Sequence, residues 1–260
     1  MSSIPDLWHT PERNALRETV RAFASKEILP HITRWEDEGE IPRDLHRAAG
    51  DLGLLALGLP QHAGGEGEMI DQLVVSEELL LAGVPSGVLA ALFTHAIALP
   101  PLVADAREEL LRDFVRPTLA GEKICALGIT EPDTGSDVAS LRTRAEHDGD
   151  GWIINGSKMF ITSGHRADFV TVAARTSDNG HEGLSMFVVE KGTPGFTVSR
   201  KLDKMGRHSS DTAAGMLGGM VEHFARVWFL YEEEHDPEVA VETATRLWAR
   251  GIGLEHPNPP

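Results

Sequence analysis

The sequence predicts an α+β fold, in which an all-α N-terminal domain precedes an antiparallel β-barrel domain. Up to about residue 122, apolar residues recur at helical spacing. From residue 124, short apolar runs alternate with Gly, Asp, Asn and Ser, as in successive strands and turns. A second change of character after residue 213 sets the expected domains at 1–123, 124–213 and 214–260.

Helices are expected in five places before residue 123. Thr10 has the chemistry of an N-cap and Pro11 suits a first helical position, so the first helix begins there and ends or bends at Pro30. Gly121 is a C-cap signal for the fifth helix, although Pro117 is able to end that helix a turn earlier. Helical spacing places the other four over 42–53, 71–81, 86–100 and 105–119.

Strand-like runs fill the middle of the chain. They cover 124–129, 141–146, 151–155, 158–162, 168–175 and 184–190. Asp148-Gly149-Asp150-Gly151, between the second and third runs, predicts a tight hairpin. Short strands at this spacing are typical of an antiparallel barrel or sandwich.

Composition limits the classes of function. The 260 residues include 24 basic and 40 acidic side chains, a net charge of −16. Such an acidic chain is not expected to bind nucleic acid or an anionic membrane surface. Cys125 is the one cysteine, which fits a reducing compartment, and its apolar neighbours indicate a core residue. Because the N-terminus lacks a signal-peptide pattern and the apolar run 86–103 is interrupted, we expect a cytoplasmic protein without a membrane span.

The stretch 128–137, GITEPDTGSD, is the most informative for chemistry. It leaves a predicted strand, turns at Pro132 and Gly135, and offers backbone N–H groups and hydroxyls to a polar or anionic ligand. Composition alone favours an ordinary surface loop. The twelve histidines show no metal-binding spacing, so no metal site is expected, and the glycine-rich stretch 64–67 indicates a turn and not a dinucleotide site.

Four motifs follow one another along residues 10–213. LPQHAGGEG at 59–67 is similar to PExxGGxG, and TEPDTGSD at 130–137 to TEPxxGSD. INGSKMFITSG at 154–164 is similar to INGxKxWITNG, and KLDKMGRHSSDTA at 201–213 to KxGxRxSDTA. In this order the motifs resemble those of the acyl-CoA dehydrogenase family, and the order makes the match far more specific than any one of them.

The resemblance implies an enzyme that binds FAD on the barrel and removes two hydrogens from an acyl-CoA thioester. It also implies an electron-transfer flavoprotein or another acceptor as partner, and a homo-oligomer. The implied cofactor-binding residues are Leu127, Ile129, Thr130, Gly135, Ser136, Phe160, Ile161 and Thr162. Ser136 is also expected to approach the pantetheine part of the substrate.

Three of these residues have distinct expected roles. By resemblance, the Thr130 hydroxyl lies near the pyrimidine edge of the flavin and the Thr162 hydroxyl near N5. Phe160 stands where the family usually has Trp and keeps a stacking surface. Without the resemblance, Phe160 is expected in the barrel core and Thr162 is an ordinary β-branched strand residue.

After residue 213 the family pattern is expected to stop. The family continues with one more barrel strand and a helical bundle that supplies the catalytic Glu. Here, helices are expected over 213–234 and from Pro237 to about residue 250. With its LWARGIGL ending at 247–254, this tail resembles the last two helices of a tetracycline-repressor-type ligand-binding domain. We therefore expect a truncated chain and assign no catalytic residue.

The sequence leaves other functional hypotheses open. The chain is either such a flavoenzyme or a non-catalytic flavin- or acyl-CoA-binding remnant, including a gene-fusion product. A third reading keeps the fold but changes the reaction, because relatives of this family run acyl-CoA oxidase, nitroalkane oxidase and monooxygenase chemistry.

Overall fold

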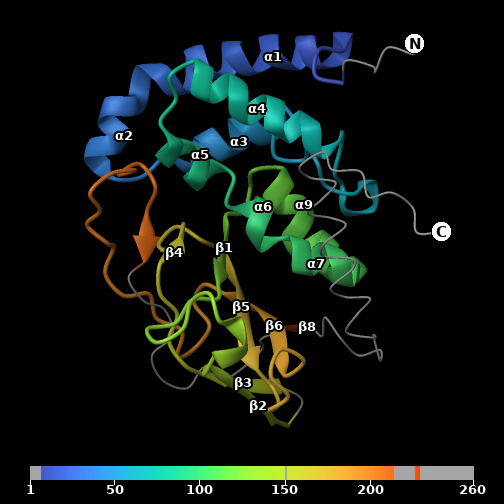
Figure 1. The fold of residues 1–260 in the computed structure, drawn as a ribbon, viewed down its shortest axis with the longest axis vertical. Helices are drawn as coiled ribbons and strands as arrows, with labels where there is room; N and C mark the ends of the chain where they lie inside the picture. Colours follow the sequence, from blue (N-terminus) through green and yellow to red (C-terminus); the bar gives the residue numbers. More distant parts are fainter. Residues whose placement is uncertain (1–6, 150, 214–225, 229–260) are drawn as a thin grey trace, which may run out of the picture.

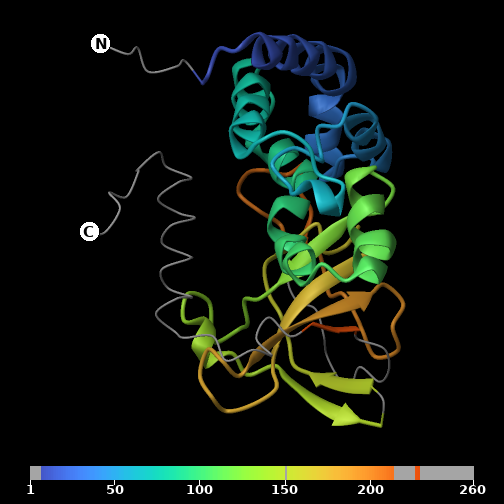
Figure 2. The ribbon, with the colours of Figure 1, turned by 90° about the vertical axis from the view of Figure 1, so that its right-hand side faces the viewer.

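The computed structural model describes residues 7–149, 151–213 and 226–228. Helices α1 and α4 lie at one end of the molecule and the hairpin β2–β3 at the other, with α6, α7 and α9 between them (Figures 1 and 2). The predicted order, a helical part followed by a β part, is confirmed. No helix of the described residues is long and apolar enough to cross a lipid bilayer.

The helical part begins as the sequence predicts. Thr10 caps α1, since its Oγ1 accepts a hydrogen bond from the N–H of Arg13 at 3.3 Å. The helices and helical turns are α1 (Pro11–Phe23), the π-turn η1 (Ala24–Ile28), the 3₁₀ turn η2 (Leu29–His31), α2 (Ile32–Glu38), α3 (Arg43–Asp51), the 3₁₀ turn η3 (Gln61–Ala63), α4 (Met69–Leu81), α5 (Ser86–Leu92), α6 (His95–Ala98), α7 (Pro100–Asp105), α8 (Glu108–Leu110), the π-turn η4 (Leu111–Val115) and α9 (Arg116–Leu119).

Two expectations about these helices need correction. The helix predicted over 86–100 is divided into α5, α6 and the start of α7, because Phe93 leaves helical geometry and Pro100 opens a new helix. Pro117 does not end the last helix, since the wider π-turn η4 precedes it and α9 continues through it. Gly121 follows α9 with φ +73°, the left-handed conformation expected at a helix C-terminus.

The β part contains a large sheet and a small one. Its elements are β1 (Cys125–Gly128), the 3₁₀ turn η5 (Val138–Ser140), β2 (Arg144–Asp148), β3 (Gly151–Asn155), β4 (Ile161–Thr162), β5 (Phe169–Arg175), β6 (Leu184–Glu190), β7 (Thr212–Ala213) and β8 (Arg226–Trp228). The large sheet has the order β3-β2-β5-β6-β8, with β1 also paired to β5, and β4 pairs with β7. The predicted hairpin is confirmed, because Asp148 lies opposite Gly151 in the β2–β3 ladder.

The sheet differs from a purely antiparallel barrel. Strand β1 runs parallel to β5, because the chain enters β1 directly from the helices and returns through β2, β3 and β4 before β5. The described strands do not close into a barrel. Strand β8 falls inside 213–234, where a helix was predicted, and pairs antiparallel with β6, so tertiary pairing overrides the local pattern there. The rest of that helix and the one from Pro237 lie outside the described residues.

Both faces of the central strands are buried. On one face of β5, Phe169 and Ala173 pack in the cluster that contains Phe114 and the helices α7 to α9, with the Phe114 and Phe169 ring centroids 4.9 Å apart. On the other face, Val170 and Val172 pack with residues of β3 and β4. A separate cluster joins α1, α3, α4 and α5. The sheet is therefore a layer that carries helices on one side and the β4 region on the other.

Two buried histidines lie where helices meet the sheet. His46 of α3 and His95 of α6 line a small internal cavity together with Cys125, the first residue of β1, and Ile124 just before it. Burial lowers the pKa of His46 to about 3 and that of His95 to about 4. Cys125 is buried as predicted, and burial raises the pKa of its thiol.

These two histidines predict an acid-dependent loss of stability. Both are neutral in the folded protein, whereas in the unfolded chain each gains a proton below about pH 6.5. The unfolded state therefore binds more protons, and stability falls as the pH drops from 6.5 towards 4. His46→Gln keeps a polar atom near the Ala91 carbonyl and removes one titrating group, so its urea midpoint is expected to fall less between pH 7 and pH 5 than that of the wild type. The exposed His181→Gln is the control, and equal slopes for wild type and His46→Gln contradict the prediction.

Candidate functional site

A buried ion pair joins the two segments that carry the predicted site residues. Lys158 Nζ lies 2.8 Å from Glu131 Oε1, with side-chain exposures of only 1% and 5%. The same ammonium donates to the Ile129 carbonyl at 3.0 Å. The loop after β1 is thereby fixed against the segment that leads into β4.

The Glu131 carboxylate is held by three hydrogen bonds. Besides Lys158 it accepts the N–H groups of Arg142 at 2.7 Å and Thr143 at 2.9 Å. Burial alone raises the pKa of Glu131, but the hydrogen bonds from Lys158 and Thr143 outweigh it and the pKa lies below its ordinary value. Burial lowers the pKa of Lys158, and the hydrogen bond that Lys158 donates to Glu131 opposes that shift. Glu131 is a structural anchor and not a base, in agreement with its predicted place in the loop.

The backbone places Thr130 and Thr162 near Phe160. The N–H of Met159 donates to the Thr130 carbonyl at 2.7 Å, which sets the loop one residue away from Phe160. Thr162 pairs with Thr212 in the β4–β7 ladder. Both hydroxyls are half-buried, and neither makes a hydrogen bond within the described part of the chain. Two polar groups are thus available to a ligand.

Phe160 presents an aromatic ring at the surface. It is 57% exposed, so the alternative that it is a core residue is wrong. Its φ of +58° lies in the left-handed region, which is uncommon for a bulky residue and is found preferentially at functional sites. An exposed aromatic ring, together with hydroxyls that have no partner within the described residues, is suited to hold a flat ligand with polar edges.

The remaining predicted residues lie around this face in different environments. Leu127 and Ile129 are half-buried and pack against the cluster beneath the helices, and Ile161 is buried against the sheet. Gly135 and Ser136 are exposed in the turn after β1. Ser136 stands between two residues that line an open groove of about 910 Å³, which also includes Arg142, Arg144 and Arg175.

Sequence reasoning did not single out the charged residues that support the face. Lys158 and Glu131 both occur within the motifs quoted above, and the available signal was a lysine inside the strand-like run 158–162 together with a glutamate just after the run 124–129. Their partnership depends on a contact between residues 27 positions apart, which the sequence pattern does not reveal. Within the described residues, no three His, Cys, Asp or Glu side chains form a group suited to a metal ion.

Comparison with known proteins identifies the family of the chain. The family model "Acyl-CoA dehydrogenase, N-terminal domain" matches residues 10–122 and "Acyl-CoA dehydrogenase, middle domain" matches residues 126–217. The long-chain specific mitochondrial acyl-CoA dehydrogenase of Sus scrofa is 38% identical over 207 residues, covering 78% of this chain and 47% of that enzyme.

Solved structures show the same relation. A Mycobacterium smegmatis structure assigned to the acyl-CoA dehydrogenases is 57% identical with a TM-score of 0.81, covering 83% of this chain and 57% of that one. A glutaryl-CoA dehydrogenase from Mycobacterium smegmatis, in complex with FADH2, is 30% identical with a TM-score of 0.71, covering 83% of this chain and 54% of that one.

The chain belongs to the acyl-CoA dehydrogenase family, with the N-terminal and middle domains of that family following each other over residues 10–217. It spans about half the length of the curated relatives that it matches.

The ion pair beneath the face predicts a large effect of breaking it. Lys158→Met keeps a long side chain but leaves the Glu131 carboxylate buried without its cation, which is expected to lower the free energy of unfolding by about 3 to 5 kcal/mol. The double variant Lys158→Met/Glu131→Gln is expected to recover part of this loss, because no uncompensated charge remains. Urea unfolding of the four proteins of this cycle measures the coupling. Additive effects of the two single changes contradict it.

Proposed function

We propose that this chain provides the FAD-binding face of an acyl-CoA dehydrogenase-type oxidoreductase. The supporting observations are the exposed Phe160 side chain on a backbone with φ +58°, and the half-buried Thr130 and Thr162, whose hydroxyls make no hydrogen bond within the described residues. An isoalloxazine needs an apolar surface for its rings and hydrogen-bonding groups at its polar edges, and the described residues offer both. The related glutaryl-CoA dehydrogenase, whose structure holds FADH2, supports the same assignment.

The proposed contacts follow the predicted set. Phe160 packs on the flavin rings, while the Thr130 and Thr162 hydroxyls bond its polar edges. Leu127, Ile129, Gly135, Ser136 and Ile161 complete the surface, Ile161 through its backbone because its side chain is buried. When bound, the flavin accepts the hydride that leaves the β-carbon of an acyl thioester. The residues of this chain position that acceptor and shield one side of it from water.

The substrate is proposed to be an acyl-CoA that reaches the face past Ser136. The groove of about 910 Å³ beside that residue has room for an extended ligand. Electrons are proposed to leave to an electron-transfer flavoprotein or another acceptor, in a cytoplasmic homo-oligomer. We also propose that the boundary between the helical and β domains lies at residue 123, and that the sheet closes into a barrel.

A non-catalytic flavin- or acyl-CoA-binding role is the second candidate. The observation that favours it is the state of Glu131, whose carboxylate is held by Lys158 and two backbone N–H groups. We assign no proton acceptor for the α-proton among the described residues. The two candidates share the flavin face and differ in turnover.

Flavin affinity tests the face directly. The purified chain is expected to take up FAD with a flavin absorbance spectrum. Thr162→Val keeps the shape of the side chain and removes one hydrogen bond. The dissociation constant for FAD is therefore expected to rise about 3- to 10-fold. Phe160→Ala is expected to cost about tenfold or more through the lost ring contact, and Phe160→Trp is expected to retain binding. Thr19→Val, on the exposed side of α1, is the matched control. Unchanged affinity in both site variants contradicts the proposed face.

Addition of an acyl-CoA to the flavin-loaded chain separates the two candidates. Loss of the visible flavin band under anaerobic conditions means that the substrate is oxidised and the flavin reduced, which supports the enzyme. A stable band together with measurable acyl-CoA binding supports the non-catalytic role. Ser136→Ala is expected to weaken acyl-CoA binding about 3- to 10-fold through one lost hydrogen bond.

A further inference from the structure

Strand β4 is held in an unusual conformation at both ends. Phe160, just before it, has φ +58°, and Ser163, just after it, has φ +60°. Left-handed conformations of residues other than glycine persist only where the surroundings enforce them. A strand of two residues has too few ladder hydrogen bonds to do so by itself. Other groups must therefore fix its position.

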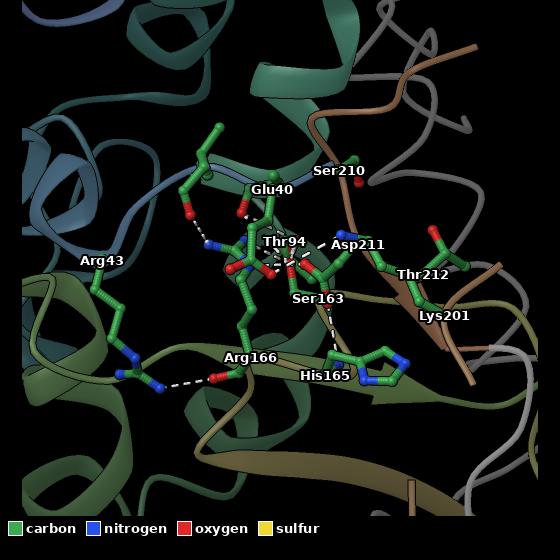
Figure 3. A network of polar contacts seen from close by, with 12 residues as sticks. Glu40, Arg43, Thr94, Ser163, His165, Arg166, Lys201, Ser210, Asp211 and Thr212 are labelled. Atoms are coloured by element: carbon green, nitrogen blue, oxygen red, sulfur yellow. Dashed lines mark hydrogen bonds and ion pairs between the residues drawn. The ribbon is translucent and has the colours of Figure 1, made fainter. Parts of the chain in front are cut away.

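Asp211 supplies most of that restraint. It is completely buried, and its carboxylate accepts the Nε–H of Arg166 at 2.7 Å and the N–H of His165 at 3.0 Å (Figure 3). Its backbone carbonyl accepts the N–H of Ser163 at 2.9 Å. One residue thus holds three successive parts of the turn that follows β4.

The same turn is bonded to the helical part of the molecule. Arg166 donates from its guanidinium to the Ile41 carbonyl, between α2 and α3, at 2.8 Å. The hydroxyls of Ser163 and Thr94, the residue before α6, are 2.9 Å apart (Figure 3). These two contacts cross between the domains next to β4. Arg43 of α3 also crosses between them, because its partly exposed guanidinium pairs with Asp168 and donates to the Arg166 carbonyl at 2.7 Å (Figure 3).

We propose that Asp211 and Arg166 are positioning residues that set β4, and with it Thr162 and Phe160, in the geometry that receives the flavin. The part that concerns the flavin rests on the proposed function, whereas the part that concerns β4 does not. A buried ion pair adds little net stability compared with apolar side chains of similar volume. Its contribution here is one fixed arrangement of the turn, tied to the helices through Ile41 and Thr94.

Asp211→Asn in the full chain tests the proposal. Asparagine keeps an acceptor but loses the charge, so amides of the segment 160–166 are expected to exchange with deuterium about tenfold faster, whereas β5 and β6 keep their wild-type rates. The dissociation constant for FAD is expected to rise about tenfold, with a shifted flavin absorbance band, because the face is no longer set in advance.

Glu78→Gln is the matched control. Glu78 is also a buried carboxylate, bonded to Arg17 and Arg21 at 2.6 Å between α1 and α4, away from β4. It is expected to lower the thermal midpoint in the same way while leaving exchange in 160–166 and FAD affinity unchanged. The double variant Asp211→Asn/Arg166→Gln removes the unpaired buried charge and is expected to recover the midpoint without recovering FAD affinity.

The outcomes are distinct. If Asp211→Asn and Glu78→Gln accelerate exchange uniformly, or if the double variant regains FAD affinity together with its midpoint, the pair only stabilises the fold and the proposal is overturned. Should Asp211→Asn fail to fold, Thr94→Val removes a single hydroxyl of the same network and is expected to accelerate exchange in 160–166, while unchanged exchange overturns the link to the helices. If the wild type takes up no FAD, the proposed function fails, and the exchange result still decides whether the pair positions β4.

Discussion

The buried ion pair between Lys158 and Glu131 is the constraint on which the candidate site depends. Removing both charges from water is costly, and that cost is offset by the pairing of the two charges and by hydrogen bonds to backbone groups. Those partners are backbone groups of the loop after β1 and of the turn before β2. The pair therefore holds three segments of the chain in one arrangement. This arrangement fixes the backbone close to Phe160 and Thr130.

The site lies where the helical part and the sheet meet, and each part limits the other. The strands β5 and β6 are buried on both faces, so they cannot shift without disturbing helices or the β4 region. Thr171 of β5 adds a polar tie, because its hydroxyl donates to the carbonyl of Ala98 at the end of α6. Arg166 and Asp211 make a similar tie at β4, because Arg166 donates to the carbonyl of Ile41 in the helical part. The proposed flavin face is thus supported by both domains.

The comparison between prediction and structure shows where local signals suffice. Thr10, Pro11 and the Asp148–Gly151 hairpin were predicted correctly, because capping and turn chemistry are decided by neighbours in sequence. The single helix over 86–100 was wrong because Phe93 leaves helical geometry and Pro100 opens a new helix. The antiparallel arrangement of β1 was wrong because strand pairing depends on the path of the chain across the molecule. Local pattern gave no reason to expect a strand at 226–228, where the edge of β6 offers a partner.

The sequence by itself determined the order of domains, the family and the residue types of the site, because motifs and periodicity are properties of consecutive residues. Only the tertiary structure decided that Phe160 is exposed, that Glu131 forms an ion pair with Lys158, and that Asp211 holds β4. The contacts that decide them join residues that are 27, 45 and 69 positions apart in the sequence. A linear pattern does not encode which buried charges meet, since their energy depends on the burial that the whole fold creates.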